Sequence, residues 1–326
     1  MRITAPTGTL RRAAGTAMLV AIVLSVAPGL WLVLLVAGVV GGVALLRTQG
    51  RSARPVIARL AVGLLVPLVL LLPWSMLLFT DPVILLLEPG VTTAAITDPN
   101  LQPWYVLLLH PGGPGMSPLW MTLGIVIAGF LALLRTDRFR IVGAFAGLGG
   151  LALLFGLVQS MVLVTPPGST GLIRPWPGPA TLLLGLALIG AAAAATEGLR
   201  GRLGGSSFTL GQPLAAAVAV LALLAPVLSA GWFGIGHDLA IRRAPAEAVP
   251  AFVAADSESA QAPRTLVIDD DASGRVLYTL LNGPGPQLGD AETGPPAAVW
   301  EQLDPYVADM ASGRGGEEIE ALAGYG

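Results

Sequence analysis

The run "AAGTAMLVAIVLSVAPGLWLVLLVAGVVGGVALL", from Ala13 to Leu46, holds 34 residues without one charged side chain. A straight helix of that length would reach about 51 Å, because each residue adds about 1.5 Å, and the apolar core of a bilayer is only about 30 Å thick. Ala27-Pro28-Gly29 stands in the middle of the run, where proline and glycine break a helix. The run therefore predicts a hairpin of two membrane helices, and it is too long for the apolar core of a simple signal peptide.

The composition as a whole is that of an integral membrane protein. Of the 326 residues, 54% are hydrophobic and only 12% are charged, and the mean hydropathy is +0.75, well above the average for soluble domains. No cysteine is present, which excludes disulfides, thiolate nucleophiles and zinc sites built from thiolates.

Five further apolar runs are long enough to cross a bilayer, which needs roughly 20 apolar residues per helix. They are Leu60 to Thr80, Met116 to Leu134, Ile141 to Val164, Pro179 to Thr196 and Leu214 to Phe233. Together with the hairpin, these runs predict about seven transmembrane helices in residues 1–233.

The arginines decide the predicted orientation. With seven spans, the N-terminus shares one side with Arg47–Arg59, Arg135–Arg140 and Glu197–Pro213, and that side holds 12 arginines and two acids. An excess of basic residues marks the cytoplasmic side, so we expect a multi-pass protein of the cell membrane with a cytoplasmic N-terminus. A single span over residues 13–46 would place the three N-terminal arginines outside and weaken this bias.

The chain after the last predicted span is acidic. Residues 1–233 carry 13 arginines and five acids, whereas residues 234–326 carry five arginines and 15 acids. Residues 234–264 predict an extended linker rich in alanine and proline, and residues 265–326 predict an extracytoplasmic α/β domain. Its expected elements are strands at Thr265–Ile268 and Val276–Leu281 and helices at Pro295–Met310 and Gly316–Ala323.

Gly324 resembles a helix C-cap that leads into a further strand, so the α/β domain is predicted to be incomplete. The predicted fold class is thus an α-helical polytopic membrane protein followed by a small, truncated α/β extracytoplasmic domain.

Small residues in the predicted spans are spaced for close helix packing. They include Gly38 and Gly41, Gly143 and Gly147, and the run Ala191 to Ala195. No acid or arginine falls inside spans three to seven. Pumps and ion transporters normally need ionisable groups within the membrane, so this pattern argues against transport.

Two acids, Asp81 and Glu88, follow the third predicted span in "FTDPVILLLEPG". At the outer interface, a carboxylate could deprotonate the hydroxyl group of an acceptor, as a general base does. The same two residues could instead mark the end of the span and cap a short interfacial helix. Both interpretations stay open at this point.

Three acids, Asp269, Asp270 and Asp271, follow a predicted strand in "VIDDDASG". Grouped carboxylates at a strand end could hold Mg²⁺ or Mn²⁺, and the stretch resembles the acidic motif of glycosyltransferases that use nucleotide sugars. Three acids before Ala-Ser-Gly also form an ordinary solvated turn. The predicted outside location favours the turn, because nucleotide sugars are not normally supplied there.

The stretch "LLLHPGGPG", residues 107–115, holds His110, which is one of two histidines. Its glycines do not fit a nucleotide-phosphate loop, because two prolines interrupt them and the protein has no lysine. Pro111 and the glycines predict a turn that returns the chain to the membrane. His110 is then an interfacial residue that could contact an acceptor, and His237 and Asp238, just beyond the last span, have the same two interpretations.

Several stretches together resemble one protein family. They are "LLLPWSMLLFTDPVILLLEPGV" (70–91), "PWYVLLLHPGGPGMSPLW" (103–120) and "VWEQLDPYVADMASGRGGEEIEALAGYG" (299–326). In this order they resemble the C-terminal membrane region and outer domain of large family 2 glycosyltransferases of GC-rich bacteria. The resemblance implies a cytoplasmic nucleotide-sugar domain before the spans, and this sequence contains no counterpart of it. The chain is therefore expected to be a fragment or a split gene product, with no residues to receive the family's donor site, metal motif or catalytic base.

The leading functional prediction is a membrane module of a cell-envelope glycosyltransferase system, active in polysaccharide biosynthesis. Its expected partners are the lipid bilayer, a polyprenyl-linked sugar or envelope glycan, and a separate catalytic domain, but not nucleic acid. No cofactor is expected in this chain, although a complete enzyme could use a divalent metal. The alternatives are a self-sufficient membrane glycosyltransferase that uses a lipid-phosphate sugar, with Asp81 or Glu88 as base, and a non-enzymatic envelope scaffold.

Overall fold

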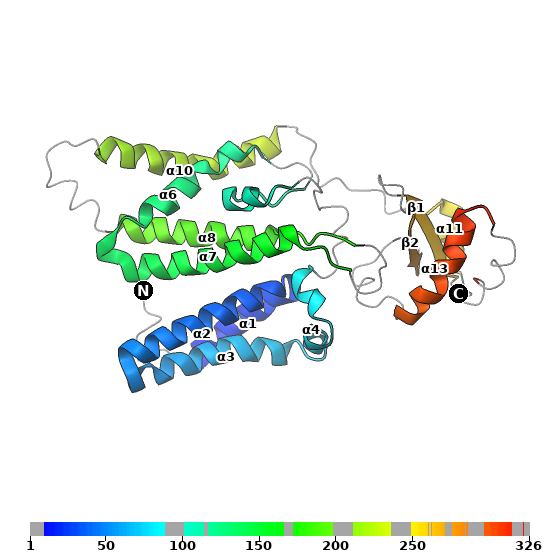
Figure 1. The fold of residues 1–326 in the computed structure, drawn as a ribbon, viewed down its shortest axis with the longest axis horizontal. Helices are drawn as coiled ribbons and strands as arrows, with labels where there is room; N and C mark the ends of the chain where they lie inside the picture. The colour runs from blue at the N-terminus through cyan, green and yellow to red at the C-terminus, as the bar shows by residue number, and fades with distance from the viewer. Residues whose placement is uncertain are drawn as a thin grey trace. The chain divides into compact units, whose positions relative to one another are not determined.

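The computed structural model describes residues 10–88, 101–113, 117–165, 172–197, 211–235, 249–259, 261, 263–270, 276–283, 285, 297–314 and 322. These residues are mostly helical and include one small sheet (Figure 1). Their contacts divide the chain into two units. The first, here called the helical body, contains helices α1 to α10, and the second contains α11, β1, β2 and α13.

The uncharged N-terminal run is divided into two helices at the predicted break, and the first of them is shorter than a membrane span needs. Helix α1 spans Leu10–Val26 and α2 spans Gly29–Gln49, so the break falls at Ala27 and Pro28 as expected. A 3-10 turn, η1 (Gly50–Ala53), then leads into α3 (Arg54–Leu70), which packs against α1. The proline-glycine pair thus divides one overlong apolar run into two separate helices.

The rest of the helical body combines short and long helices. The short elements are η2 (Trp74–Met76), α4 (Leu77–Thr80), η3 (Pro82–Leu86), η4 (Pro103–Leu108), η5 (Leu119–Met121) and η6 (Thr136–Arg138). The longer ones are α6 (Leu123–Ala132), α7 (Phe139–Met161), α8 (Gly178–Thr196) and α10 (Gly211–Gly234). Helix α7 packs along α8, and α6 lies between α8 and α10 in the contact pattern (Figure 1).

The prediction of seven transmembrane helices is not supported. Among the described residues, three segments are long and apolar enough to cross a membrane: Gly29–Leu70, Thr136–Met161 and Gly178–Thr196. The remaining apolar stretches are shorter, at 10–17 residues: Ala13–Val26, Leu123–Ala132 and, within the longer helix α10, Ala216–Trp232. Length is the physical reason, since a helix of ten residues such as α6 rises only about 15 Å.

Two of the predicted spans are shorter as helices than their apolar runs. The run Leu60 to Thr80 contains Pro73, and α3 ends at Leu70 before a series of short turns. The run Met116 to Leu134 begins with Pro118 and the turn η5, which leaves only α6 as a regular helix. Apolar composition was therefore a poor guide to helix length wherever proline interrupted the run.

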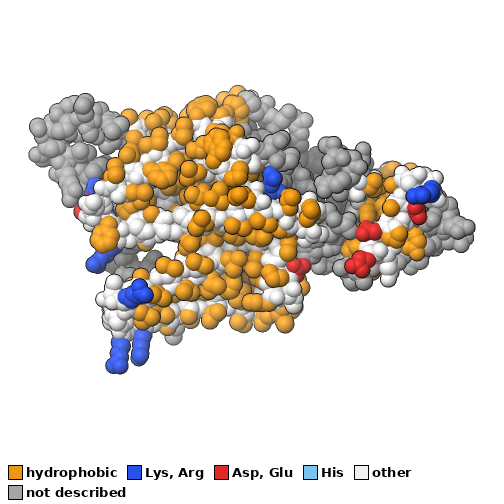
Figure 2. Space-filling view, in the orientation of Figure 1, with side chains coloured by type: hydrophobic (Ala, Val, Ile, Leu, Met, Phe, Trp, Pro, Cys, Tyr) orange, Lys and Arg blue, Asp and Glu red, His pale blue; other side chains and the backbone are white. Residues whose placement is uncertain are grey.

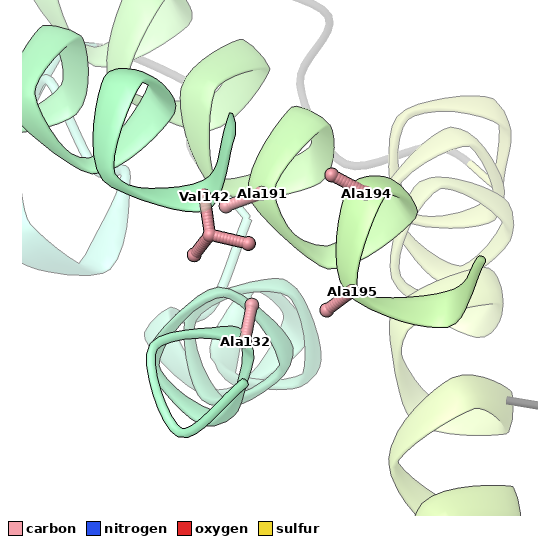
Figure 3. Close-up of a cluster of buried hydrophobic side chains, with 5 residues drawn as sticks. All are labelled: Ala132, Val142, Ala191, Ala194 and Ala195. Carbon is pink, nitrogen blue, oxygen red and sulfur yellow. The ribbon is translucent and has the colours of Figure 1, made fainter. Parts of the chain in front are cut away.

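Small residues bring the helices of the body close together at one end. Ala132 from α6, Val142 from α7 and Ala191, Ala194 and Ala195 from α8 form a buried cluster, and their side chains turn toward one another (Figure 3). Alanine at these positions lets the three helices approach, because no long side chain separates them. The predicted role of the alanine run is thereby confirmed.

The glycine pairs behave differently from the alanine run. Gly38 faces Leu64 of α3 at close range, as a packing glycine does. Gly41, Gly143 and Gly147 have no atom of the described chain within 4 Å of the position of an added Cβ. Gly143 and Gly147 therefore show no close packing against the described residues, contrary to the expectation.

The second unit is a small hairpin with a helix on it. Strands β1 (Thr265–Asp270) and β2 (Val276–Leu281) pair antiparallel, with Ile268 opposite Tyr278. Helix α13 (Ala297–Ala311) contacts β2 and buries Trp300, Leu303 and Val307. Both strands were predicted, although β1 is two residues longer, and α13 falls within two residues of the predicted helix.

The linker and the last predicted helix of the tail differ in how far the structure describes them. The linker was predicted to be extended, but Ala251–Ser257 forms a short helix, α11, whose start after Pro250 is typical of a helix. The predicted helix at Gly316–Ala323 lies, except for one residue, outside the described residues.

Candidate functional site

Glu88 is a buried acid at the end of η3. Only 7% of this residue is exposed. The turn that carries it begins at Asp81, whose carboxylate accepts a hydrogen bond from the backbone N–H of Val83 at 3.2 Å, and Pro82 occupies the first helical position. Asp81 therefore acts as a cap, while the turn carries Glu88 back onto the helices.

The residues around Glu88 come from four parts of the helical body and form what we call the Glu88 pocket. They are Ala27, Gly29 and Leu30 at the start of α2, Leu85 and Leu87 beside η3, Phe155 and Gln159 of α7, and Pro179 of α8. The pocket leaves no space for a water molecule. Any partner of a polar atom in this conformation must therefore come from the protein itself.

Gln159 is the second buried polar residue of the Glu88 pocket, with 2% exposed. Its Nε2 donates a hydrogen bond to the backbone carbonyl of Leu86 at 3.2 Å, which ties α7 to η3. Its Oε1 and the Oε2 of Glu88 are both buried and have no hydrogen-bond partner among the described residues. The pocket thus contains two side-chain acceptors that lack a donor, which is costly in an apolar site.

Gly29 allows η3 to approach the start of α2. A Cβ at this position would collide with the backbone carbonyl of Leu85 and with the ring of Phe155. The helix break at Pro28 places Gly29 at the first position of α2, where its bare backbone meets η3. The break at Pro28 that separates α1 from α2 therefore also places Gly29 in the wall of the Glu88 pocket.

Burial changes the acidity of Glu88. The loss of hydration raises the pKa of its carboxyl group from 4.5 to about 8, and a backbone hydrogen bond opposes this rise only in part. The residue lies outside the three segments that could cross a membrane. At pH 7 the carboxyl group is therefore mostly protonated and neutral.

A second cluster surrounds His110. Trp104 contacts Tyr105 with ring centroids 4.2 Å apart, and the ring of His110 lies 5.8 Å from that of Tyr105. Val106 is fully buried and meets Gly156 of α7, which anchors η4 on the helical body. Trp104 is 53% exposed. The cluster thus exposes the ring of Trp104 and leaves Tyr105 and His110 half-buried beside it on a packed turn.

The turn after η4 has the positive φ angles that its glycines allow. Gly112 and Gly113 have φ angles of 78° and 103°, which favour glycine, and Leu109 adopts the left-handed conformation with a φ of 60°. The carbonyl oxygen of Gly112 accepts a hydrogen bond from Trp176 Nε1 at 3.4 Å. Residues 107–113 of "LLLHPGGPG" therefore turn the chain, and Pro114 and Gly115 lie outside the described residues.

The other predicted site residues are only partly placed. Asp269 and Asp270 belong to β1 rather than to a turn after it, because the strand extends through both. His237, Asp238 and Asp271 lie outside the described residues. Within the part of the chain that the structure describes, no three histidine or acidic side chains come together as a metal site would require.

Charged pairs gather at the other ends of α7 and α8, here called the arginine end. Arg135 contacts Asp137 at 3.0 Å, and Arg138 contacts Glu197 at 2.7 Å. Blue arginine side chains project from this end and from the turn between α2 and α3, whereas hydrophobic side chains cover much of the helices between (Figure 2). The arginine end is thus polar and accessible, unlike the Glu88 pocket.

Sequence reasoning missed Gln159 and Gly29 as partners of Glu88. Gln159 is a polar residue within the apolar run Ile141 to Val164, but the sequence does not show that its side chain is buried or that it lies near Glu88.

Comparisons of the chain with protein families, with curated proteins and with solved structures found no match.

Proposed function

We propose that the chain is a membrane module of a cell-envelope glycosyltransferase system. In this proposal it positions a polyprenyl-linked sugar or an envelope glycan, and the sugar-transfer chemistry resides on a separate domain or chain. Segments long and apolar enough to cross a membrane support the membrane role. The proposed orientation places the arginine end in the cytoplasm and the Glu88 pocket outside, because basic residues favour the cytoplasmic side.

The observation that carries the proposal is the aromatic surface formed by Trp104, Tyr105 and His110. Aromatic rings offer apolar faces that stack on sugar rings, and their polar atoms suit the boundary between lipid and water. Val106 fixes the turn that carries the surface, so the rings are held in place before any acceptor binds. A preformed surface lowers the ordering cost of binding.

Acceptor binding can be tested with a photoactivatable polyprenyl-phosphate sugar added to membranes that contain the protein. We expect Trp104→Ala and His110→Ala each to lower crosslinking by about fivefold, the equivalent of about 1 kcal/mol of aromatic contact. Phe139→Ala is a matched control, because Phe139 is an aromatic residue, 66% exposed, at the arginine end. Equal crosslinking in all variants would exclude this surface as the acceptor site.

The absence of transfer chemistry in the chain is a separate part of the proposal. Membranes that contain the protein alone, supplied with radiolabelled nucleotide sugars, should give no transfer above that of membranes without it. Transfer should appear when a catalytic glycosyltransferase domain is supplied. Robust transfer by this chain alone would contradict the proposal.

A self-sufficient enzyme that uses a lipid-phosphate sugar is the second candidate, and one observation favours it. The pKa of Glu88, raised by burial to about 8, is close to the pH at which a general base must work. Glu88 would first have to leave its pocket, which has no space for a substrate. In this case Glu88→Gln should abolish transfer from a lipid-linked sugar, while Asp81→Asn, which removes a carboxylate but keeps an oxygen that can cap the turn, should retain it. Full activity in both variants would remove this candidate.

A further inference from the structure

We propose that the Glu88 pocket is a proton-binding site, in which the neutral carboxyl group of Glu88 donates a hydrogen bond to Gln159 Oε1 and holds η3 against α2 and α7. This inference is independent of any glycosyltransferase activity. It assigns Glu88 a bound proton and a structural task instead of the role of a free carboxylate.

The two acceptors of the pocket call for a proton between them. Glu88 Oε2 and Gln159 Oε1 are both buried, and neither has a hydrogen-bond partner among the described residues. Gln159 Nε2 is already used by the carbonyl of Leu86. No water fits in the pocket, so the hydroxyl of a protonated Glu88 is the remaining side-chain donor in its described lining. In the proposed arrangement, one proton on Glu88 satisfies both oxygen atoms.

No charge in the described lining offsets an ionised Glu88. The residues that face it from α2, α7 and α8 are apolar or neutral, and the nearest acid on its own element, Asp81, accepts a hydrogen bond from Val83. An isolated carboxylate in such surroundings is strongly disfavoured. Ionisation of Glu88 is therefore expected to release η3 rather than to leave a buried anion.

The direction of the pH effect follows from the two states. In the open state Glu88 meets water and its pKa returns to 4.5, whereas in the closed state burial raises the pKa to about 8. Between these values the open state has lost its proton and the closed state keeps it, so each pH unit favours opening by up to about tenfold. Below about pH 4.5 and above about pH 8 the equilibrium no longer depends on this group.

The absence of cysteine from the natural sequence allows a direct test of opening. A single cysteine at Leu85→Cys, in the wall of the Glu88 pocket, is labelled with a maleimide in detergent micelles from pH 4.5 to 9. The labelling rate is divided by that of the same cysteine in a Glu88→Gln background, which cancels the ionisation of the thiol. We expect this ratio to rise by up to about tenfold per pH unit and to level off near pH 8.

A second cysteine keeps the test decisive if the double variant does not fold. Phe79→Cys, at a residue that is 66% exposed, reports the chemistry of the reagent, so the ratio of Leu85→Cys to Phe79→Cys without the Glu88 change should show the same rise. Gln159→Leu removes the acceptor and should increase labelling at low pH. A ratio that stays constant from pH 4.5 to 9 would overturn the proposal.

Discussion

The two ends of the helical body handle charge in opposite ways. At the arginine end, Arg138 and Glu197 form an ion pair with about a third and two thirds of their side chains exposed. At the other end, Glu88 is buried beside Gln159 without a cationic partner in the described lining. The exposed acid has both water and a nearby opposite charge, whereas the buried acid has neither in its described lining and keeps its proton.

The two ends of the helical body therefore differ in how strongly they respond to pH. Exposed ion pairs contribute little, because solvent screens them and long side chains lose freedom when they pair. A buried neutral acid, in contrast, couples the packing of a whole turn to pH. The Glu88 pocket is therefore the sensitive end of the body, and the arginine end is the tolerant one.

The largest loss of stability is expected when a methyl group is added to Gly29 in the wall of the Glu88 pocket. Gly29→Ala should destabilise the helical body by about 2 kcal/mol, because the added Cβ collides with the carbonyl of Leu85 and the ring of Phe155. Gly41→Ala on the same helix is the control, since its Cβ would meet no described atom, and it should be neutral or slightly stabilising. Thermal unfolding in detergent measures both, and equal midpoints would contradict the description of the pocket wall.

A smaller effect is expected where an acid does have a donor. In the second unit, Tyr278 donates a hydrogen bond to Asp304, and burial together with this bond raises the pKa of the tyrosine. Tyr278→Phe should therefore cost about 1 kcal/mol, the usual value of one hydrogen bond. Chemical denaturation followed by fluorescence is the measurement, in a background that keeps Trp300 and has phenylalanine at the six other tryptophan positions. A loss of unfolding free energy as large as that of Gly29→Ala would contradict the expectation that the hydrogen bond between Tyr278 and Asp304 contributes only about 1 kcal/mol.

The smallest effect is expected at the arginine end. Arg138→Ala and Glu197→Ala should each change stability by less than about 1 kcal/mol, because their ion pair is exposed, and the change should shrink as salt is added. Unfolding midpoints at low and high salt test this. A large loss that does not depend on salt would show that the two ends do not differ as described.

Sequence alone predicted the local features of the fold well. Pro28 and Gly29 correctly marked the break between α1 and α2, and the apolar runs of α7 and α8 correctly indicated helices within two or three residues of their expected bounds. The two short strands of the tail were also found, because turn-forming residues bound them. Each of these features depends on residues that are neighbours in the chain.

The predictions that the structure did not support concern features that depend on contacts between distant residues or on proline. Pro73 and Pro118 shortened helices that composition alone had extended, so the count of seven spans was not supported. The site was foreseen only as a pair of loop acids, Asp81 and Glu88. Their different roles follow from what each touches: a backbone N–H for Asp81, and α2 and α7 for Glu88. No local pattern contains that information.

The protonation of Glu88 at neutral pH is the central claim, and infrared difference spectroscopy of the protein in lipid nanodiscs measures it most directly. Spectra of the unaltered protein are compared with those of Glu88→Gln, and Asp81→Asn is the control. At pH 7 we expect a carboxylic-acid C=O band that Glu88→Gln removes and Asp81→Asn retains, and that titrates with a pKa of about 8. A carboxylate signal for Glu88 at pH 7, with a pKa near the ordinary value of 4.5, would contradict the account.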